Sequence, residues 1–148
     1  MIAYIDTSAL VKNYIEENGS RLLRTLFLEI EHLESSILTE LELTASIERS
    51  KAIRRIDSPR YREIFQRIEK DIRKLPISFI QVEPEHWKVA KRLIKQRRLR
   101  VGDAIQLACA LASQKEWGSS LQFLCADHSL LEAARLEGLK VRDISRDQ

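Results

Sequence analysis

The chain has 148 residues, of which 44% are hydrophobic and 32% charged, and its basic residues outnumber its acidic ones by three. This balance excludes a disordered chain and predicts one soluble domain, residues 1–148, with a core of its own. No apolar stretch approaches the ~20 residues of a membrane span, and the N-terminus lacks a secretory signal. We therefore expect a cytoplasmic protein without membrane contact, in which Cys109 and Cys125 stay reduced.

The N-terminus has the pattern of a buried strand that leads directly into a helix. Residues 2–5 are a short apolar run, Asp6 follows it, and helical apolar spacing begins at Ala9. An aspartate at the carboxyl end of a strand lies where open α/β sheets bind ligands. Asp6 also fits a simpler interpretation, in which it only caps the helix.

Two helices and a short strand are predicted next. Gly19-Ser20 opens the first helix, and residues 33–38 hold the strand and the loop that leaves it. A long helix then runs from Thr39 to about Arg55. With Thr39 as N-cap, Glu40 takes the first helical position and Glu42 the third.

A turn at residues 57–59 separates this helix from the next. Ser58 is predicted as the N-cap and Pro59 as the first helical residue. The helix that follows has the most regular apolar spacing in the chain. Its apolar positions are Tyr61, Ile64, Phe65, Ile68, Ile72 and Leu75.

The second half of the chain continues the alternation of strands and helices. The predicted elements are a strand over 76–82 with Pro76 at its edge, a helix from Pro84, an apolar helix over 104–112 opened by Gly102-Asp103, a strand over 121–126, a helix over 128–137 closed by Gly138, and a strand over 140–144. Such alternation predicts a three-layer α/β/α fold with a mainly parallel sheet.

Four acids stand at junctions between these elements. Asp6 and Asp127 end strands, Asp103 begins the apolar helix, and Glu42 falls in the first turn of a long helix. Each has a simpler interpretation: the aspartates could cap helices, and Thr39-x-x-Glu42 fits a capping box. Parallel topology, however, would gather strand ends on one edge of the sheet.

Carboxylates that converge repel one another, and burying them without a partner is costly. Apart from His128, no basic residue shares these junctions, so a cation is the expected partner. Oxygen ligands favour Mg²⁺ or Mn²⁺, and the lack of suitably spaced His and Cys argues against zinc. Such a site suits phosphoryl chemistry, in which divalent ions activate water and stabilise charge on the leaving oxygen.

The stretches around these acids resemble the four motifs of PIN-domain ribonucleases. They read YIDTSALVK (4–12), LTELEL (38–43), GDAIQLA (102–108) and CADHSLL (125–131). The likeness is greatest to the VapC-like toxins of bacterial and archaeal toxin–antitoxin pairs. The motifs occur in the family's order, and together they span nearly the whole chain.

The resemblance implies a three-layer PIN fold, an Mg²⁺- or Mn²⁺-dependent endoribonuclease activity, homodimerisation and a cognate antitoxin. It assigns the catalytic and metal-binding acids to Asp6, Glu42, Asp103 and Asp127, with Ser8 as an auxiliary polar residue. Asp6 and Asp103 would be the principal ligands and Asp127 a further one, directly or through water. Glu42 would bind metal or orient the attacking water. Cys125 departs from the family, because many relatives carry Thr or Ser there.

Basic residues fit an RNA substrate, although each also fits an ordinary solvated helix face. One group lies before Asp103, and a second lies at the far end of the Glu42 helix: Lys91, Arg92, Lys95, Arg97, Arg98 and Arg100, and Arg49, Lys51, Arg54 and Arg55.

Two other functions stay open on the sequence. One is a PIN-like module that binds RNA or protein without cutting. The other is an aspartate-dependent phosphatase or phosphotransferase acting through Asp6, although such enzymes commonly place a second aspartate where Ser8 stands.

Overall fold

The computed structural model describes residues 1–74 and 77–147, and one parallel five-stranded sheet organises them. The sheet has the order β3-β2-β1-β4-β5, with β1 at its centre, and its four pairings are parallel. The strands are β1 Ile2–Ile5, β2 His32–Ser36, β3 Ile77–Ile80, β4 Leu121–Cys125 and β5 Lys140–Asp143.

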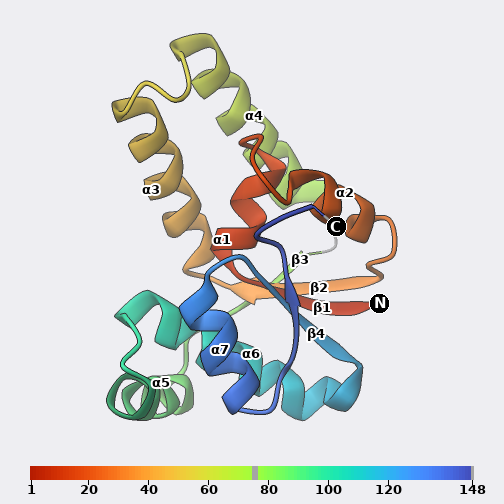
Figure 1. Ribbon diagram of the computed structural model, residues 1–148, viewed down its shortest axis with the longest axis vertical. Helices are drawn as coiled ribbons and strands as arrows, with labels where there is room; N and C mark the ends of the chain where they lie inside the picture. The colour runs from red at the N-terminus through yellow and green to blue at the C-terminus, as the bar shows by residue number, and fades with distance from the viewer. Residues whose placement is uncertain (75–76, 148) are drawn as a thin grey trace.

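Helices cover both faces of this sheet (Figure 1), which confirms the three-layer α/β/α fold. They are α1 Thr7–Leu10, α2 Ser20–Phe27, α3 Thr39–Ala52, α4 Ser58–Lys74, α5 Pro84–Arg97, α6 Val101–Trp117 and α7 His128–Leu136, with the 3₁₀ turns η1 Val11–Asn13 and η2 Gly118–Ser120. Among the described residues, no helix is both long enough and apolar enough to cross a membrane.

The core has two halves, because successive side chains of a strand point to opposite faces of the sheet. Tyr4 and Phe123 pack with α5, α6 and α7, while Ile5 and Leu124 pack with α1 to α4. These four side chains are fully buried. The central strands are therefore apolar on both faces, as the continuous apolar runs of the sequence predict.

Two predicted helix caps are wrong. Asp57, not Ser58, caps α4, because its carboxylate accepts a hydrogen bond from the Arg60 N–H at 2.8 Å. Ser58 is therefore the first helical residue and Pro59 the second. Leu38, not Thr39, is the N-cap of α3, and no side chain caps that helix.

The ends of other elements also differ from the prediction. Helix α6 begins at Val101 and continues to Trp117, beyond the predicted end at residue 112. Its last turns expose polar side chains to solvent, so the apolar run in the sequence ends before the helix does. Strand β2 ends at Ser36. Gly138 closes α7 as predicted, with a φ of +87° that favours glycine. The predictions for Leu75 and Pro76 lie outside the described residues.

Candidate active site

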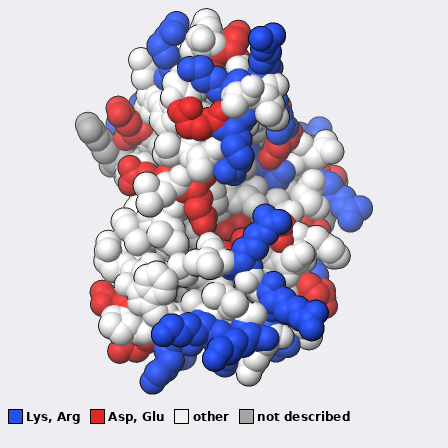
Figure 2. Space-filling model, turned by 90° about the vertical axis from the view of Figure 1, so that its left-hand side faces the viewer, with Lys and Arg blue, Asp and Glu red and all other residues white. Residues whose placement is uncertain are grey.

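The four acids singled out in the sequence line one cavity at the carboxyl edge of the sheet. The cavity measures about 270 Å³ and is lined by Asp6, Thr7, Ser8, Glu42, Ala45, Ser46, Arg49, Asp103 and Asp127. The lining comes from the starts of α1, α6 and α7, which the parallel strands bring together, and from α3 between its first turn and Arg49. Figure 2 shows acidic side chains in the hollow at the middle of this face, with basic side chains above and below it.

Asp6 is the most deeply buried of these acids, with 3% of its surface exposed. It caps α1, and its Oδ2 atom accepts hydrogen bonds from the N–H of Ser8 at 2.9 Å and the hydroxyl of Ser8 at 2.5 Å. Burial raises the pKa of Asp6 to about 6, Ser8 opposes that rise, and the nearby Glu42 and Asp103 add to it. Asp6 is therefore both a helix cap and a carboxylate under electrostatic strain.

Asp103 and Asp127 approach the cavity from the other half of the fold. Asp103 lies in the first turn of α6, whose N-cap is Arg100, so Asp103 does not cap that helix. Burial raises the pKa of Asp103, and repulsion from Asp127 and Glu42 raises it further. Asp127 caps α7 through its Oδ1 atom, which accepts from the Leu130 N–H at 2.8 Å. The cap interpretation therefore holds for Asp6 and Asp127, and both still line the cavity.

Glu42 is held by side chains that the sequence analysis did not identify. Its Oε2 atom accepts hydrogen bonds from the hydroxyl of Thr7 and from the amide of Gln106, the latter at 2.9 Å. Gln106 is completely buried, and its amide oxygen accepts from the Tyr4 hydroxyl at 2.7 Å. Gln106 was detectable as a polar residue in an apolar helix, one turn after Asp103 and on the same helix face.

The predicted capping box does not form, because its two members are engaged elsewhere. Thr39 is completely buried, and its hydroxyl bonds to Ser35 at 2.7 Å and to the Gln106 amide at 2.9 Å. Glu42 instead reaches the start of α6, where a Cβ atom on Gly102 would come within 2.7 Å of its Oε1 atom. Gly102 is therefore the residue that allows Glu42 and α6 to approach closely.

Cys125 lies at the end of β4, between Asp6, Ser8 and Asp127. Its Sγ atom lies 3.7 Å from Asp6 Oδ2 and 3.5 Å from the Ser8 hydroxyl, and it accepts from the Asp127 N–H at 3.3 Å. Ser8 also accepts from the Ala126 N–H at 3.0 Å, which ties the ends of β1 and β4 together. Burial raises the pKa of Cys125, so it is a neutral thiol that contacts both aspartates. Cys109 and Cys125 are both free.

The donor set suits a hard divalent cation, with one restriction. Within residues 1–74 and 77–147, no three His, Cys, Asp or Glu side chains lie close enough to hold one ion together. Mg²⁺ is usually bound through one or two carboxylates and several waters, so a pair of these acids is sufficient. Burial and mutual repulsion raise the pKa values of Asp6 and Asp103, and a bound cation would offset both effects.

The basic residues divide into two groups of different character. Arg49 lines the same cavity as the four acids, so it is placed to meet an anion there. Arg92 and Arg97 instead pair with Glu137, at 2.7 Å and 2.8 Å. Those two arginines hold α5 against the end of α7, and they do not face the cavity.

Comparisons with known proteins identify the family of the chain. The model of the PIN domain matches residues 3–117. The chain belongs to the PIN domain family. Members of this family are generally nucleases and typically use divalent metal ions. No curated protein matches the chain significantly.

Solved structures share the fold over nearly the whole chain. The Neisseria gonorrhoeae FitAcB structure is 13% identical with a TM-score of 0.64, and it covers 97% of this chain and 99% of its own. VapBC2 from Rickettsia felis, bound to a promoter DNA fragment, is 15% identical with a TM-score of 0.60, and covers 97% and 98%. PAE2754 from Pyrobaculum aerophilum is 18% identical with a TM-score of 0.59, and covers 98% and 90%. At these identities the likeness concerns the fold.

Proposed function

We propose that the protein is a divalent-metal-dependent endoribonuclease that hydrolyses phosphodiester bonds of RNA. The observation that carries this proposal is the cavity of about 270 Å³ lined by Asp6, Glu42, Asp103 and Asp127 in a PIN-domain chain. The carboxylates give it further support, since burial and mutual repulsion raise the pKa values of two of them, Asp6 and Asp103.

Asp6 and Asp103 are the proposed ligands of Mg²⁺ or Mn²⁺, because a cation would offset the burial and the repulsion that raise their pKa values. Asp127 acts as a further ligand, directly or through water. The bound cation would lower the pKa of water and stabilise charge on the phosphate oxygens. Ser8 fixes the Asp6 carboxylate through its two hydrogen bonds to Oδ2.

Glu42 is the proposed group that orients the attacking water or accepts its proton. Thr7 and Gln106 hold its Oε2 atom, so the carboxylate cannot rotate freely away from the cavity. Preorganised groups of this kind lower a barrier because they need no rearrangement during the reaction. Arg49, which lines the cavity beside the acids, contacts the phosphate of the RNA.

The biological role we propose is that of a toxin held in check by a cognate antitoxin. Two structures of the same fold are complexes named VapBC2 and FitAcB, which supports a protein partner. We also propose a homodimer, as in the VapC-like proteins that the motifs resemble. Both proposals concern assembly, and neither is needed for the chemistry of the cavity.

The test is cleavage of mixed cellular RNA by the purified protein with Mg²⁺, with Mn²⁺ and with EDTA. We expect internal cleavage with either metal and none with EDTA or with the Asp6→Asn variant. Binding of RNA by folded protein without cleavage under any of these conditions would contradict the nuclease and favour a binding module. Cleavage that persists in EDTA would contradict the metal dependence.

For the toxin role, we expect the protein expressed alone to slow growth, and co-expression of an adjacent small gene to relieve the effect. Harmless expression of folded, RNA-cleaving protein would contradict this role and leave the nuclease proposal in place.

A further inference from the structure

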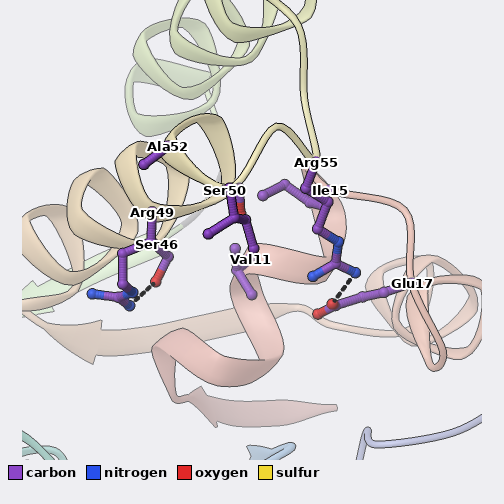
Figure 3. Close-up of a pocket in the computed structure, with 9 residues that line it drawn as sticks. Val11, Ile15, Glu17, Ser46, Arg49, Ser50, Ala52 and Arg55 are labelled. Atoms are coloured by element: carbon purple, nitrogen blue, oxygen red, sulfur yellow. Dashed lines mark hydrogen bonds and ion pairs between the residues drawn. The ribbon is translucent and has the colours of Figure 1, made fainter.

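A second, larger cavity adjoins the candidate active site. It measures about 420 Å³, and we call it the α3 groove; it is lined by Val11, Ile15, Glu17, Ser46, Arg49, Ser50, Ala52, Ile53 and Arg55 (Figure 3). Ser46 and Arg49 line both cavities. The two hollows are therefore neighbours, and the Ser46–Arg49 pair stands between them.

One face of helix α3 connects the two cavities. Glu42, Ser46, Arg49 and Ile53 follow one another at intervals of three or four residues, so they lie on the same side of the helix. From Glu42 to Ile53 this face extends about 16 Å, at about 1.5 Å per residue. That length accommodates several nucleotides at about 3.4 Å each in a stacked strand.

An arginine lies at each end of the α3 groove, and among the described residues only one of the two is paired with a carboxylate. Arg49 is exposed, its guanidinium donates to the Ser46 hydroxyl at 3.0 Å, and no described carboxylate lies within ion-pair distance of it. At the other end Arg55 pairs with Glu17 at 2.9 Å (Figure 3). Arg49 is therefore the groove's available cation, beside the cavity of the acids.

The wall between these charges is apolar and partly uncovered. Ile53 is 73% exposed, although it is a large aliphatic residue, and Val11 and Ile15 line the groove opposite α3. The chain turns sharply after Ile53 through Arg54, whose φ of +57° is unusual for a residue other than glycine. This turn brings Arg55 to Glu17 and leaves the side chain of Ile53 facing solvent.

We propose that the α3 groove binds the nucleotide next to the scissile phosphate of a single-stranded RNA. Arg49 contacts the phosphate at the boundary between the two cavities, and the base of that nucleotide lies against Ile53. The inference rests on the proposed function, because it assumes that the four-acid cavity holds the scissile phosphate. Single-strand binding combines positive charge along the phosphates with side chains, usually aromatic, against which the bases lie; in the α3 groove the exposed aliphatic Ile53 takes the second part.

The test measures binding in EDTA, where no cleavage occurs, by the fluorescence anisotropy of a labelled eight-nucleotide single-stranded RNA. Arg49→Ala should weaken binding about tenfold and reduce the slope of log K against log salt by about 0.7, the value for one phosphate contact. Ile53→Ser should weaken binding by about five- to tenfold and leave that slope unchanged, because it removes only an apolar contact.

Matched controls lie on the opposite face of the sheet. Lys115→Ala removes an exposed charge from α6, and Leu136→Ser removes a leucine that is 59% exposed on α7. Both controls should bind RNA like the wild type. If Arg49→Ala and Ile53→Ser also bind like the wild type, the proposal is wrong; if they instead lose a co-purifying protein, the groove belongs to that protein. Wild-type cleavage with Mg²⁺, measured separately, tests the proposed function, so the two failures are distinguishable.

Discussion

Two buried acids on neighbouring strands show opposite electrostatic behaviour. Asp6 follows β1 and Glu34 lies in β2, and they expose 3% and 6% of their surfaces. Burial raises the pKa of Asp6 to about 6. Burial alone would also raise the pKa of Glu34, but the neighbouring side chains, among them His32 and Trp117 in hydrogen-bond contact, reverse the shift and lower it.

The surroundings of the two carboxylates explain the difference. Glu34 lies within β2, where its Oε1 atom meets His32 Nε2 at 2.9 Å and accepts from Trp117 Nε1 at 3.0 Å. Asp6 accepts from the N–H and hydroxyl of Ser8 and, weakly, from the Cys125 thiol, and it faces the carboxylates of Glu42 and Asp103. The fold stabilises the charge of Glu34 and is destabilised by that of Asp6. A carboxylate kept at such a cost is typical of a functional site.

The largest expected effect comes from neutralising the strained acids. Asp6→Asn or Asp103→Asn should lower RNA cleavage on the order of 10³-fold, because each removes a charge that the reaction uses. Both variants should fold, and in EDTA at neutral pH Asp6→Asn should be more stable than the wild type. Cleavage and thermal unfolding of the same samples check this. Full activity in either variant would remove that residue from the site.

The next effect separates the two glutamates at the start of α3. Glu42→Gln should lower cleavage on the order of 10²-fold, because its carboxylate lines the cavity and handles a proton. Glu40→Gln is the matched control, since Glu40 is exposed and two residues away, on another side of the helix. Both should melt close to the wild type. Equal cleavage by the two variants would contradict the assignment of Glu42.

The pH dependence of stability should differ between Asp6 and its replacement. The pKa of Asp6 rises from 3.8 to about 6 on folding, so the folded protein binds a proton more tightly than the unfolded chain. In EDTA, wild-type stability should therefore fall as pH rises from about 4 to above 6, by up to about 3 kcal/mol from this group. Asp6→Asn should show a shallower decline in urea unfolding. An equal decline of stability in the two proteins would mean that a group other than Asp6 causes the pH dependence.

The smallest effect is expected at the stabilised acid. Glu34→Gln should lower the free energy of unfolding by about 1–2 kcal/mol, because the charged acceptor of His32 and Trp117 is lost. Cleavage should stay at the wild-type level. This pattern is the reverse of that predicted for Asp6→Asn, and loss of cleavage on Glu34→Gln would break the distinction between the two acids.

The sequence predicted the sheet and the meeting of the four acids because both follow from local patterns. Apolar runs predict strands, and parallel topology gathers their ends. The hydrogen bonds that orient Glu42 depend on contacts between distant residues: Tyr4 and Gln106 are 102 positions apart. Such contacts also explain why the predicted Thr39 cap is wrong, because the Thr39 hydroxyl forms hydrogen bonds with Ser35 and Gln106 instead.

The contrast between Asp6 and Glu34 also lay beyond the sequence. Glu34 falls within a strand, and one of the donors that lower its pKa is Trp117, 83 positions away. The predicted N-cap of α4 was wrong for a different, local reason. Asp57 and Ser58 are adjacent and both suit an N-cap, so the pattern alone did not choose between them.

The central claim is that the buried Asp6 carboxylate binds a divalent cation. The change in melting temperature on adding Mg²⁺ or Mn²⁺ at neutral pH tests this claim most directly. A cation at 100 times its Kd stabilises the fold by about 2.7 kcal/mol. For a chain of this size, that corresponds to a rise of about 5–10 °C. We predict this rise for the wild type and for Glu34→Gln, and little or none for Asp6→Asn. An equal rise in the wild type and Asp6→Asn would show that the cation binds elsewhere and would contradict the account.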